Sequence, residues 1–318
     1  MTQTLTKKKK LGYAFGIFTE SLVYNMFYTY YLTFLNEIIG IQPKFSAIII
    51  FISIAWDAVT DPLIGSYTDR AGVDKRKVMR KSILPLAISS IVAYLSFGAG
   101  FSSQALKIIV YTVISMLIWI FYTLYSIPYY AIVAEITEDY DERTSIRSLS
   151  SLLNAFAIGL GNILPALVPT VAVLLGKKYE SNSYAVIAAV IAIISITLGY
   201  ICCGSLKGVY EPKKAIPGAK KERGVIISTI KAFFDILKLK PTKWYFLFVF
   251  FYLIFSSMIQ SNLTYMVIDC IGMDYDTGIA IVIITLVLSM AITVPIVEKI
   301  AEKKDRRFAS ILFLRNSD

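Results

Sequence analysis

Long runs of hydrophobic residues, separated by short polar connections, dominate this chain. A membrane-spanning helix needs about 20 apolar residues, because each residue advances it by about 1.5 Å across a hydrocarbon core of about 30 Å. Runs of that length predict transmembrane helices. We predict eight complete spans, at Leu11–Glu37, Phe45–Tyr67, Ser82–Phe101, Ile108–Ala134, Ser148–Leu175, Ser183–Leu206, Trp244–Cys270 and Thr277–Val297. A ninth apolar segment begins at Phe308 and reaches Leu314.

The composition supports an all-α polytopic membrane protein. Hydrophobic residues make up 56% of the chain, charged residues 17%, and the mean hydropathy is +0.65. Such values lie outside the range of soluble globular domains. The net charge of +10 would suit a nucleic-acid partner, but the positive residues lie in the connections between spans, so we expect no nucleic-acid binding. The chain has no histidine, and its cysteines show no metal or disulfide spacing.

Lysine and arginine are distributed unequally over the two sides of the predicted bundle. One side receives almost all of them, whereas the other receives only Lys44, Lys107, Lys177 and Lys178. Positive residues collect on the cytoplasmic side of membrane proteins. We therefore expect a multi-pass protein of the plasma or inner membrane, with its N-terminus and the long connection Lys207–Lys243 in the cytoplasm.

The long connection divides the chain into two groups of spans. It contains Pro212, Pro217 and Gly218, and its second part, Val225–Leu239, has the pattern of an amphipathic helix on the membrane surface. We predict a six-helix bundle over 1–206, a cytoplasmic linker over 207–243 and a partial second bundle over 244–318. A weak repeat relates Pro62 to Pro295 and suggests two parallel halves. The second half has fewer spans than the first, so we expect the chain to be truncated at its C-terminus.

Two carboxylates, Asp57 and Asp61, lie near the middle of the second predicted span. Each costs on the order of 2.5–3.5 kcal/mol to place there. At positions i and i+4 they share one helix face, about 6 Å apart. No basic residue lies inside a complete span, so a bound cation or a proton is expected to neutralise them, although a structural ion pair is the alternative. Ligands that are all oxygen favour Na⁺ or H⁺ over a transition metal.

Two motifs carry a family resemblance. Gly65-x-x-x-Asp69-Arg70-x-Gly72, followed by Lys75-Arg76-Lys77, resembles the loop signature of the major facilitator superfamily. Trp56-Asp57-Ala58-x-x-Asp61-Pro62-x-x-Gly65 is similar to the narrower family of glycoside–pentoside–hexuronide:cation symporters, as is Tyr122-Thr123-x-x-x-Ile127-Pro128. The resemblance implies a major facilitator fold with a complete six-helix N-terminal bundle and a partial C-terminal bundle.

The resemblance also implies roles for individual residues. Asp57, Asp61 and Thr123 would bind the coupling cation, Na⁺ or H⁺, with Thr60 at the position of a family asparagine ligand. Glu20 and Tyr122 would bind the solute. The chain departs from the family at Ser126, which replaces an acidic sugar ligand, and it has no clean counterpart of a helix-5 arginine, since Arg147 lies one turn earlier.

Further polar groups share the layer of the predicted site. Counting about 1.5 Å per residue from the cytoplasmic edge places Glu20, Asp57, Asp61, Thr123 and Ser126 near the midplane of the membrane, where transporter sites lie. Tyr24, Asn25 and Tyr28 follow Glu20 at helical spacing, and with Tyr130 they could stack on or hydrogen-bond a polyhydroxylated solute. Ordinary helix packing is the alternative for these residues. Asp69 and Arg70, at the cytoplasmic edge, fit a gate.

We therefore predict a secondary active transporter that couples a cation to a sugar or glycoside by alternating access. Paired carboxylates can also serve acid–base hydrolysis, but the chain offers no second catalytic signature, so we expect no enzyme and no cofactor beyond the coupling ion. Two alternatives remain open. One is a related symporter for lysolipid or another non-sugar solute, and the other is a truncated membrane protein that does not transport.

Overall fold

The computed structural model describes residues 5–70, 73–166, 180–212, 231 and 235–265, together with residues 272, 285, 288, 289, 292, 293 and 296. All regular structure in these residues is helical. The first part of the chain contains α1 (Lys7–Ala14), α2 (Ile17–Thr33), the π-helical turn η1 (Phe34–Ile38), α3 (Pro43–Arg70), α4 (Lys75–Ala93), the 3₁₀ turn η2 (Ser96–Gly100), α5 (Gln104–Ile136), α6 (Tyr140–Ala166) and α8 (Glu180–Ser205).

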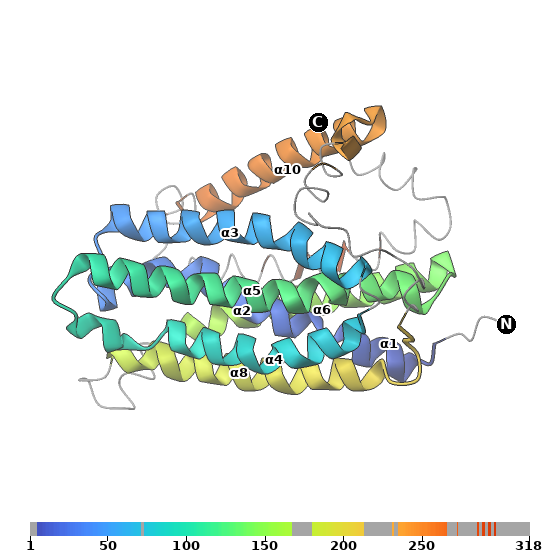
Figure 1. Ribbon diagram of the computed structural model, residues 1–318, viewed down its shortest axis with the longest axis horizontal. Helices are drawn as coiled ribbons and strands as arrows, with labels where there is room; N and C mark the ends of the chain where they lie inside the picture. Colours follow the sequence, from blue (N-terminus) through green and yellow to red (C-terminus); the bar gives the residue numbers. More distant parts are fainter. Residues whose placement is uncertain are drawn as a thin grey trace.

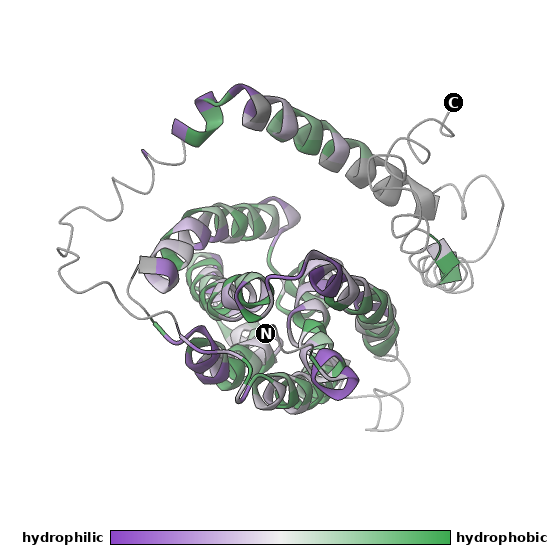
Figure 2. Cartoon of the chain, turned by 90° about the vertical axis from the view of Figure 1, so that its right-hand side faces the viewer, coloured by the Kyte–Doolittle hydropathy of each residue, from purple (hydrophilic) through white to green (hydrophobic). Residues whose placement is uncertain are grey.

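These helices lie alongside one another in a single bundle (Figure 1). α2 packs against α6 and α8, α4 packs against α5 and α8, and α3 packs against α5. Seen along the helices, hydrophilic residues gather at the helix ends nearest the viewer (Figure 2). The remaining long helix, α10 (Lys240–Tyr265), runs outside this bundle in both views.

The helices agree with the predicted all-α polytopic fold. Four of them are long and apolar enough to cross a membrane, over Pro43–Asp69, Lys75–Gly100, Gln104–Ile136 and Ser183–Ser205. Large apolar side chains such as Phe51 and Ile193 point outward, as expected where lipid surrounds a helix. The predicted span Trp244–Cys270 corresponds to α10. Most of the span Thr277–Val297, most of the linker and the whole segment from Phe308 lie outside the described residues.

The first predicted span is not one uninterrupted helix. The chain leaves α-helical geometry at Phe15 and Gly16, where the amide N–H groups of Gly16, Phe18 and Thr19 donate to carbonyls three residues earlier. The Tyr125 hydroxyl donates to the Gly16 carbonyl at 2.9 Å. Gly16 has no side chain, which lets α5 and α8 approach this turn closely. The break starts α2 at Ile17 and puts Glu20 in its first turn.

The third predicted span also differs, at both ends. Its helix begins at Lys75 instead of Ser82, because the Asp74 side chain caps it by accepting from the Lys77 N–H at 3.1 Å. The helix ends at Ala93 and continues as the 3₁₀ turn η2. In that turn Gly98 lies against the Tyr111 ring.

Replacing Gly16 by alanine should destabilise the bundle by about 1–3 kcal/mol, the usual cost of overpacking. A Cβ atom there would lie 2.6 Å from Cys202 Sγ and 2.7 Å from the Tyr129 ring. Gly204→Ala is the matched control, because a Cβ atom at Gly204 on α8 meets nothing within 4 Å. Denaturant unfolding in detergent should show a lower free energy of unfolding for Gly16→Ala and an unchanged one for Gly204→Ala. Equal effects of the two substitutions would contradict the close packing at the break.

Candidate functional site

The pairing of α3 with α5 brings a carboxylate pair against a buried hydroxyl. Thr123 Oγ1, fully buried on α5, donates to Asp57 Oδ1 at 2.9 Å. Asp61 follows one turn later on α3 and lies beside the same hydroxyl. Both carboxylates are half-buried, and among the described residues neither forms an ion pair. The structure therefore brings together Asp57, Asp61 and Thr123 in an acidic, oxygen-rich site that no recorded basic group neutralises.

Thr60 is placed differently from these three residues. It is buried on α3, and its hydroxyl donates to the backbone carbonyl of Asp57 at 3.1 Å. That bond engages the hydroxyl with its own helix, not with a carboxylate. One further oxygen of this turn was missed by the sequence reasoning. Pro62 lacks an N–H, so the Ala58 carbonyl has no helical donor four residues on.

An aromatic cluster, formed by Tyr24 and Tyr28 on α2 and by Trp119 and Tyr122 on α5, lies beside Asp57. The ring centroids of Tyr24 and Tyr28 are 4.4 Å apart, and those of Tyr24 and Tyr122 are 6.0 Å apart. Tyr24 is 39% exposed and Tyr28 is 41% exposed, whereas Trp119 is buried. In the cluster, the buried Trp119 ring supports the two accessible rings of Tyr24 and Tyr28, next to the carboxylate pair.

Glu20 is buried, with 3% of its surface exposed, on the other side of Tyr122. The Tyr130 hydroxyl, from the C-terminal half of α5, donates to Glu20 Oε1. The Tyr130 ring is 41% exposed, and the Arg147 guanidinium lies 5.4 Å from its centroid. Two predicted solute ligands, Glu20 and Tyr130, are therefore bound to each other.

Two other predicted solute ligands lie away from the aromatic cluster. Ser126 is buried on α5. Asn25 faces α6, where its Cβ lies close to Gly161, and its amide donates to the Ser21 carbonyl at 2.7 Å. No recorded contact joins either residue to the cluster.

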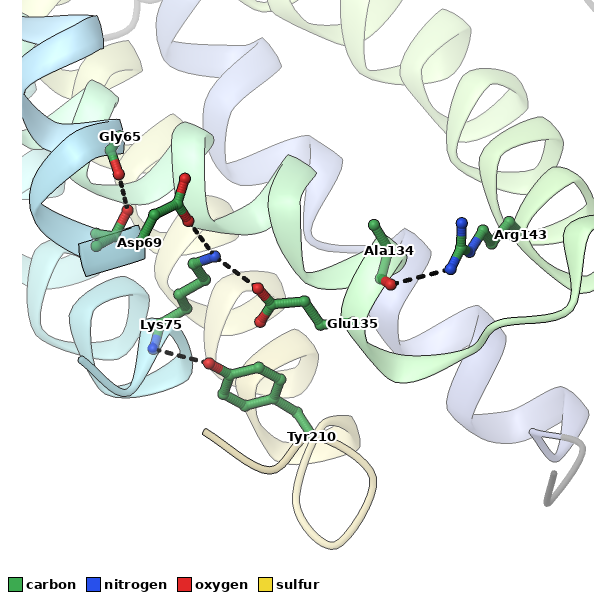
Figure 3. A network of polar contacts seen from close by, with 8 residues as sticks. Gly65, Asp69, Lys75, Ala134, Glu135, Arg143 and Tyr210 are labelled. Carbon is green, nitrogen blue, oxygen red and sulfur yellow. Dashed lines mark hydrogen bonds and ion pairs between the residues drawn. The ribbon is translucent and has the colours of Figure 1, made fainter. Parts of the chain in front are cut away.

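Asp69, one of the two residues predicted to form a gate, belongs to a network of three charges (Figure 3). Lys75, which begins α4 and is 4% exposed, places its Nζ 2.5 Å from Asp69 Oδ1 and 2.8 Å from Glu135 Oε1. It thereby joins the ends of α3, α4 and α5. The side chain of Arg70, the other predicted gate residue, lies outside the described residues. Lys75 and Glu135 were missed as partners, because the sequence presented Lys75 only as one of several basic residues in a loop.

The N-terminal segment is attached to the first turn of α6, through Glu142. Glu142 Oε1 accepts from the Leu5 amide at 2.7 Å and lies 3.1 Å from Lys10 Nζ. Burial acts to raise the pKa of Glu142, but hydrogen bonds from Thr137, Leu5 and Lys10 outweigh it, so that the pKa lies below its ordinary value. The ionised form of Glu142 is therefore favoured in the folded protein.

This contact predicts a pH-dependent contribution to stability. Because the folded-state pKa is lowered, the contribution is complete above the ordinary pKa of about 4.3 and is lost as the pH falls through the lower folded-state value. Glu142→Gln should lower the melting temperature at pH 7, and its curve should approach that of the wild type below about pH 4. Glu138→Gln, two residues before the helix, is the control. A stability difference that is independent of pH would contradict this account.

The chain is similar to known proteins over most of its length. Residues 12–313 match the model of a family described as MFS/sugar transport protein. The symporter YjmB of Bacillus subtilis, which is named as uncharacterized, is 27% identical over 72% of this chain and 48% of its own length. The putative glycoside/cation symporter YagG of Escherichia coli is 30% identical over 66% of this chain and 45% of its own length.

A vertebrate protein is also similar. The sodium-dependent lysophosphatidylcholine symporter 1 of Xenopus tropicalis is 26% identical over 41% of this chain and 25% of its own length. The chain spans less than half the length of each of these relatives. The family model, in contrast, covers nearly the whole chain, including the helices that carry the carboxylate pair, the aromatic cluster and the charged network. The chain therefore belongs to the MFS/sugar transport protein family of membrane transporters.

Proposed function

We propose that this protein is a Na⁺-coupled symporter of a sugar or glycoside. The observation that carries the proposal is the contact of the buried Thr123 hydroxyl with the half-buried Asp57, beside Asp61. Two carboxylates, a hydroxyl and the Ala58 carbonyl, which receives no helical hydrogen bond from Pro62, would form the hard-oxygen donor set that suits Na⁺. A proton would be the alternative coupling ion at the same carboxylates.

The solute is proposed to bind on the aromatic cluster. The accessible rings of Tyr24 and Tyr28 offer an apolar face for a sugar ring, and their hydroxyls offer hydrogen bonds. Because the cluster adjoins Asp57, a cation bound there would change the electrostatic potential that the solute meets. Neutralising the carboxylates would favour solute entry, which is the differential affinity that coupling requires.

Alternating access would move the six-helix bundle of residues 1–206 against the part of the chain that begins at residue 244. The segment 207–243 would serve as the cytoplasmic linker. In this proposal the N-terminus is cytoplasmic, and the charged network of Asp69, Lys75 and Glu135 lies on that same side. Breaking and re-forming the exposed Asp69–Lys75 pair would accompany opening and closing.

The proposal is tested by uptake into vesicles that contain the purified chain. Labelled methyl galactoside, xylose and glucuronate would be offered with an inward Na⁺ gradient, an inward H⁺ gradient or neither. We expect saturable accumulation of one of them only with the Na⁺ gradient, and none for Asp57→Asn combined with Asp61→Asn. Accumulation driven by H⁺ alone would overturn the choice of Na⁺. Uptake of labelled lysophosphatidylcholine, but of no sugar, would overturn the choice of solute.

A further inference from the structure

The carboxyl group of Glu20 is only half satisfied by the protein around it. Oε1 accepts the Tyr130 hydroxyl, whereas Oε2 is inaccessible to solvent and receives no hydrogen bond from the described residues. The side chain as a whole is 3% exposed. A buried polar atom of this kind needs an explanation, because leaving such a group without a partner is costly.

Among the residues that the structure describes, no cation is paired with Glu20. Arg147 on α6 is the nearest basic residue, but it is exposed, and it donates to the Tyr130 carbonyl at 2.7 Å. The other titratable neighbours are neutral hydroxyl or thiol groups. They are Tyr13 on α1, Tyr122, Tyr125 and Tyr130 on α5, and Cys202 on α8, next to Gly16 and Tyr125.

An ionised carboxylate in this environment would carry an unpaired buried charge, which costs several kcal/mol. The position of Glu20 in the first turn of α2 favours the negative charge, but it offsets only part of that cost. A proton on Oε2 removes the charge and keeps Oε1 as the acceptor for Tyr130. No other group has to change its protonation state.

We propose that Glu20 is a proton-binding site separate from the Asp57–Asp61 pair. It holds one proton on Oε2 at neutral pH in the conformation described, and it releases that proton when the carboxyl group is opened to water. Tyr130 is the side chain that separates Glu20 from the accessible surface, since its hydroxyl contacts Oε1 while its ring is 41% exposed. A displacement of Tyr130 would therefore couple the opening of this face to proton release.

This inference gives Glu20 a different role from that of a simple acceptor for solute hydroxyls. In the protonated form Oε2 is a donor, so a solute that reached it would have to present an acceptor oxygen. The inference does not depend on the identity of the solute or on Na⁺ binding. It can therefore fail while the proposed symport stands, and the reverse also holds.

The test is infrared spectroscopy of the purified chain in lipid membranes at neutral pH. The Asp57→Asn/Asp61→Asn background is used, so that neither of those groups can contribute a protonated carboxyl band. We expect a carbonyl-stretch band of a protonated carboxyl group, shifted by deuterium exchange. Adding Glu20→Gln should abolish the band, whereas adding Glu135→Gln, a carboxylate paired with Lys75, should leave it unchanged.

Tyr130→Phe provides a second readout that keeps Glu20 in place. Loss of the hydrogen bond to Oε1 should move the band to higher frequency, whereas a purely structural role for Tyr130 predicts no such shift. Absence of the band in every protein that retains Glu20 would overturn the inference. Survival of the band in the Glu20→Gln variant would also overturn it, because the proton would then belong to another group.

Discussion

Asp57→Asn should weaken Na⁺ binding by about 100-fold or more. Two unit charges 4 Å apart interact with about 4 kcal/mol at an effective dielectric constant of about 20, and each 1.4 kcal/mol changes a dissociation constant about tenfold. Asparagine keeps the shape of the side chain and can still accept a hydrogen bond from Thr123. The expected loss of Na⁺ affinity therefore measures the contribution of the negative charge and not a change in packing. The measurement is the increase of melting temperature with Na⁺ concentration, at constant ionic strength, in detergent.

Thr123 offers a graded comparison at the same site. Thr123→Val removes the hydroxyl and should weaken Na⁺ binding by roughly tenfold, since a hydrogen bond to a charged group contributes about 1.5–3 kcal/mol. Thr123→Ser keeps the hydroxyl and should bind Na⁺ nearly as the wild type does. Asp69→Asn, which removes a carboxylate paired with Lys75, is the control for a general charge effect. If Asp69→Asn and Asp57→Asn weakened binding equally, the assignment of the site to α3 and α5 would be wrong.

Lys75→Met should lower the free energy of unfolding by about 3 kcal/mol, the lower end of the cost of breaking a buried ion pair. Lys75 is 4% exposed and the Glu135 side chain is 10% exposed, so the substitution removes the Lys75 charge from beside a nearly buried carboxylate. The side chain of Asp69 is 65% exposed, and its pair with Lys75 should contribute less than about 1 kcal/mol. Unfolding in mixed detergent and denaturant would measure these differences.

The double variant Lys75→Met/Glu135→Leu distinguishes the loss of the ion pair from the loss of packing. Because it removes both buried charges of the pair, more than half of the stability lost in Lys75→Met should return. Asp69→Asn alone should have a small effect. A double variant as unstable as Lys75→Met would mean that the lysine stem, and not the charge of Glu135, accounts for the loss.

The fold class could be predicted from the sequence, because the length of a hydrophobic run indicates whether it can form a membrane-spanning helix. α3, α5 and α8 lie within a few residues of their predicted bounds for this reason. The break at Gly16 could not be predicted in the same way. The run from Leu11 to Glu37 is apolar on both sides of the break, and the Gly16 carbonyl there accepts a hydrogen bond from Tyr125, which lies more than a hundred residues away in the sequence.

Only part of the candidate site could be predicted from the sequence. Helical spacing alone placed Asp57 and Asp61 on one helix face, and the family motif indicated Thr123 as a further ligand. The bond between Tyr130 and Glu20 joins residues 110 positions apart, and neither residue has a sequence pattern that names the other. The ion pair of Lys75 with Glu135 could not be predicted either. A basic residue between two spans fits the expected distribution of positive charge whether or not it forms a buried ion pair.

The central claim is that the carboxylate pair on α3 binds the coupling cation, and equilibrium binding of ²²Na⁺ to the purified protein tests it most directly. The account predicts a saturable site with one Na⁺ per chain, lost in the Asp57→Asn/Asp61→Asn variant and retained in Glu20→Gln. Binding of Na⁺ to the double variant with unchanged affinity and stoichiometry would contradict it.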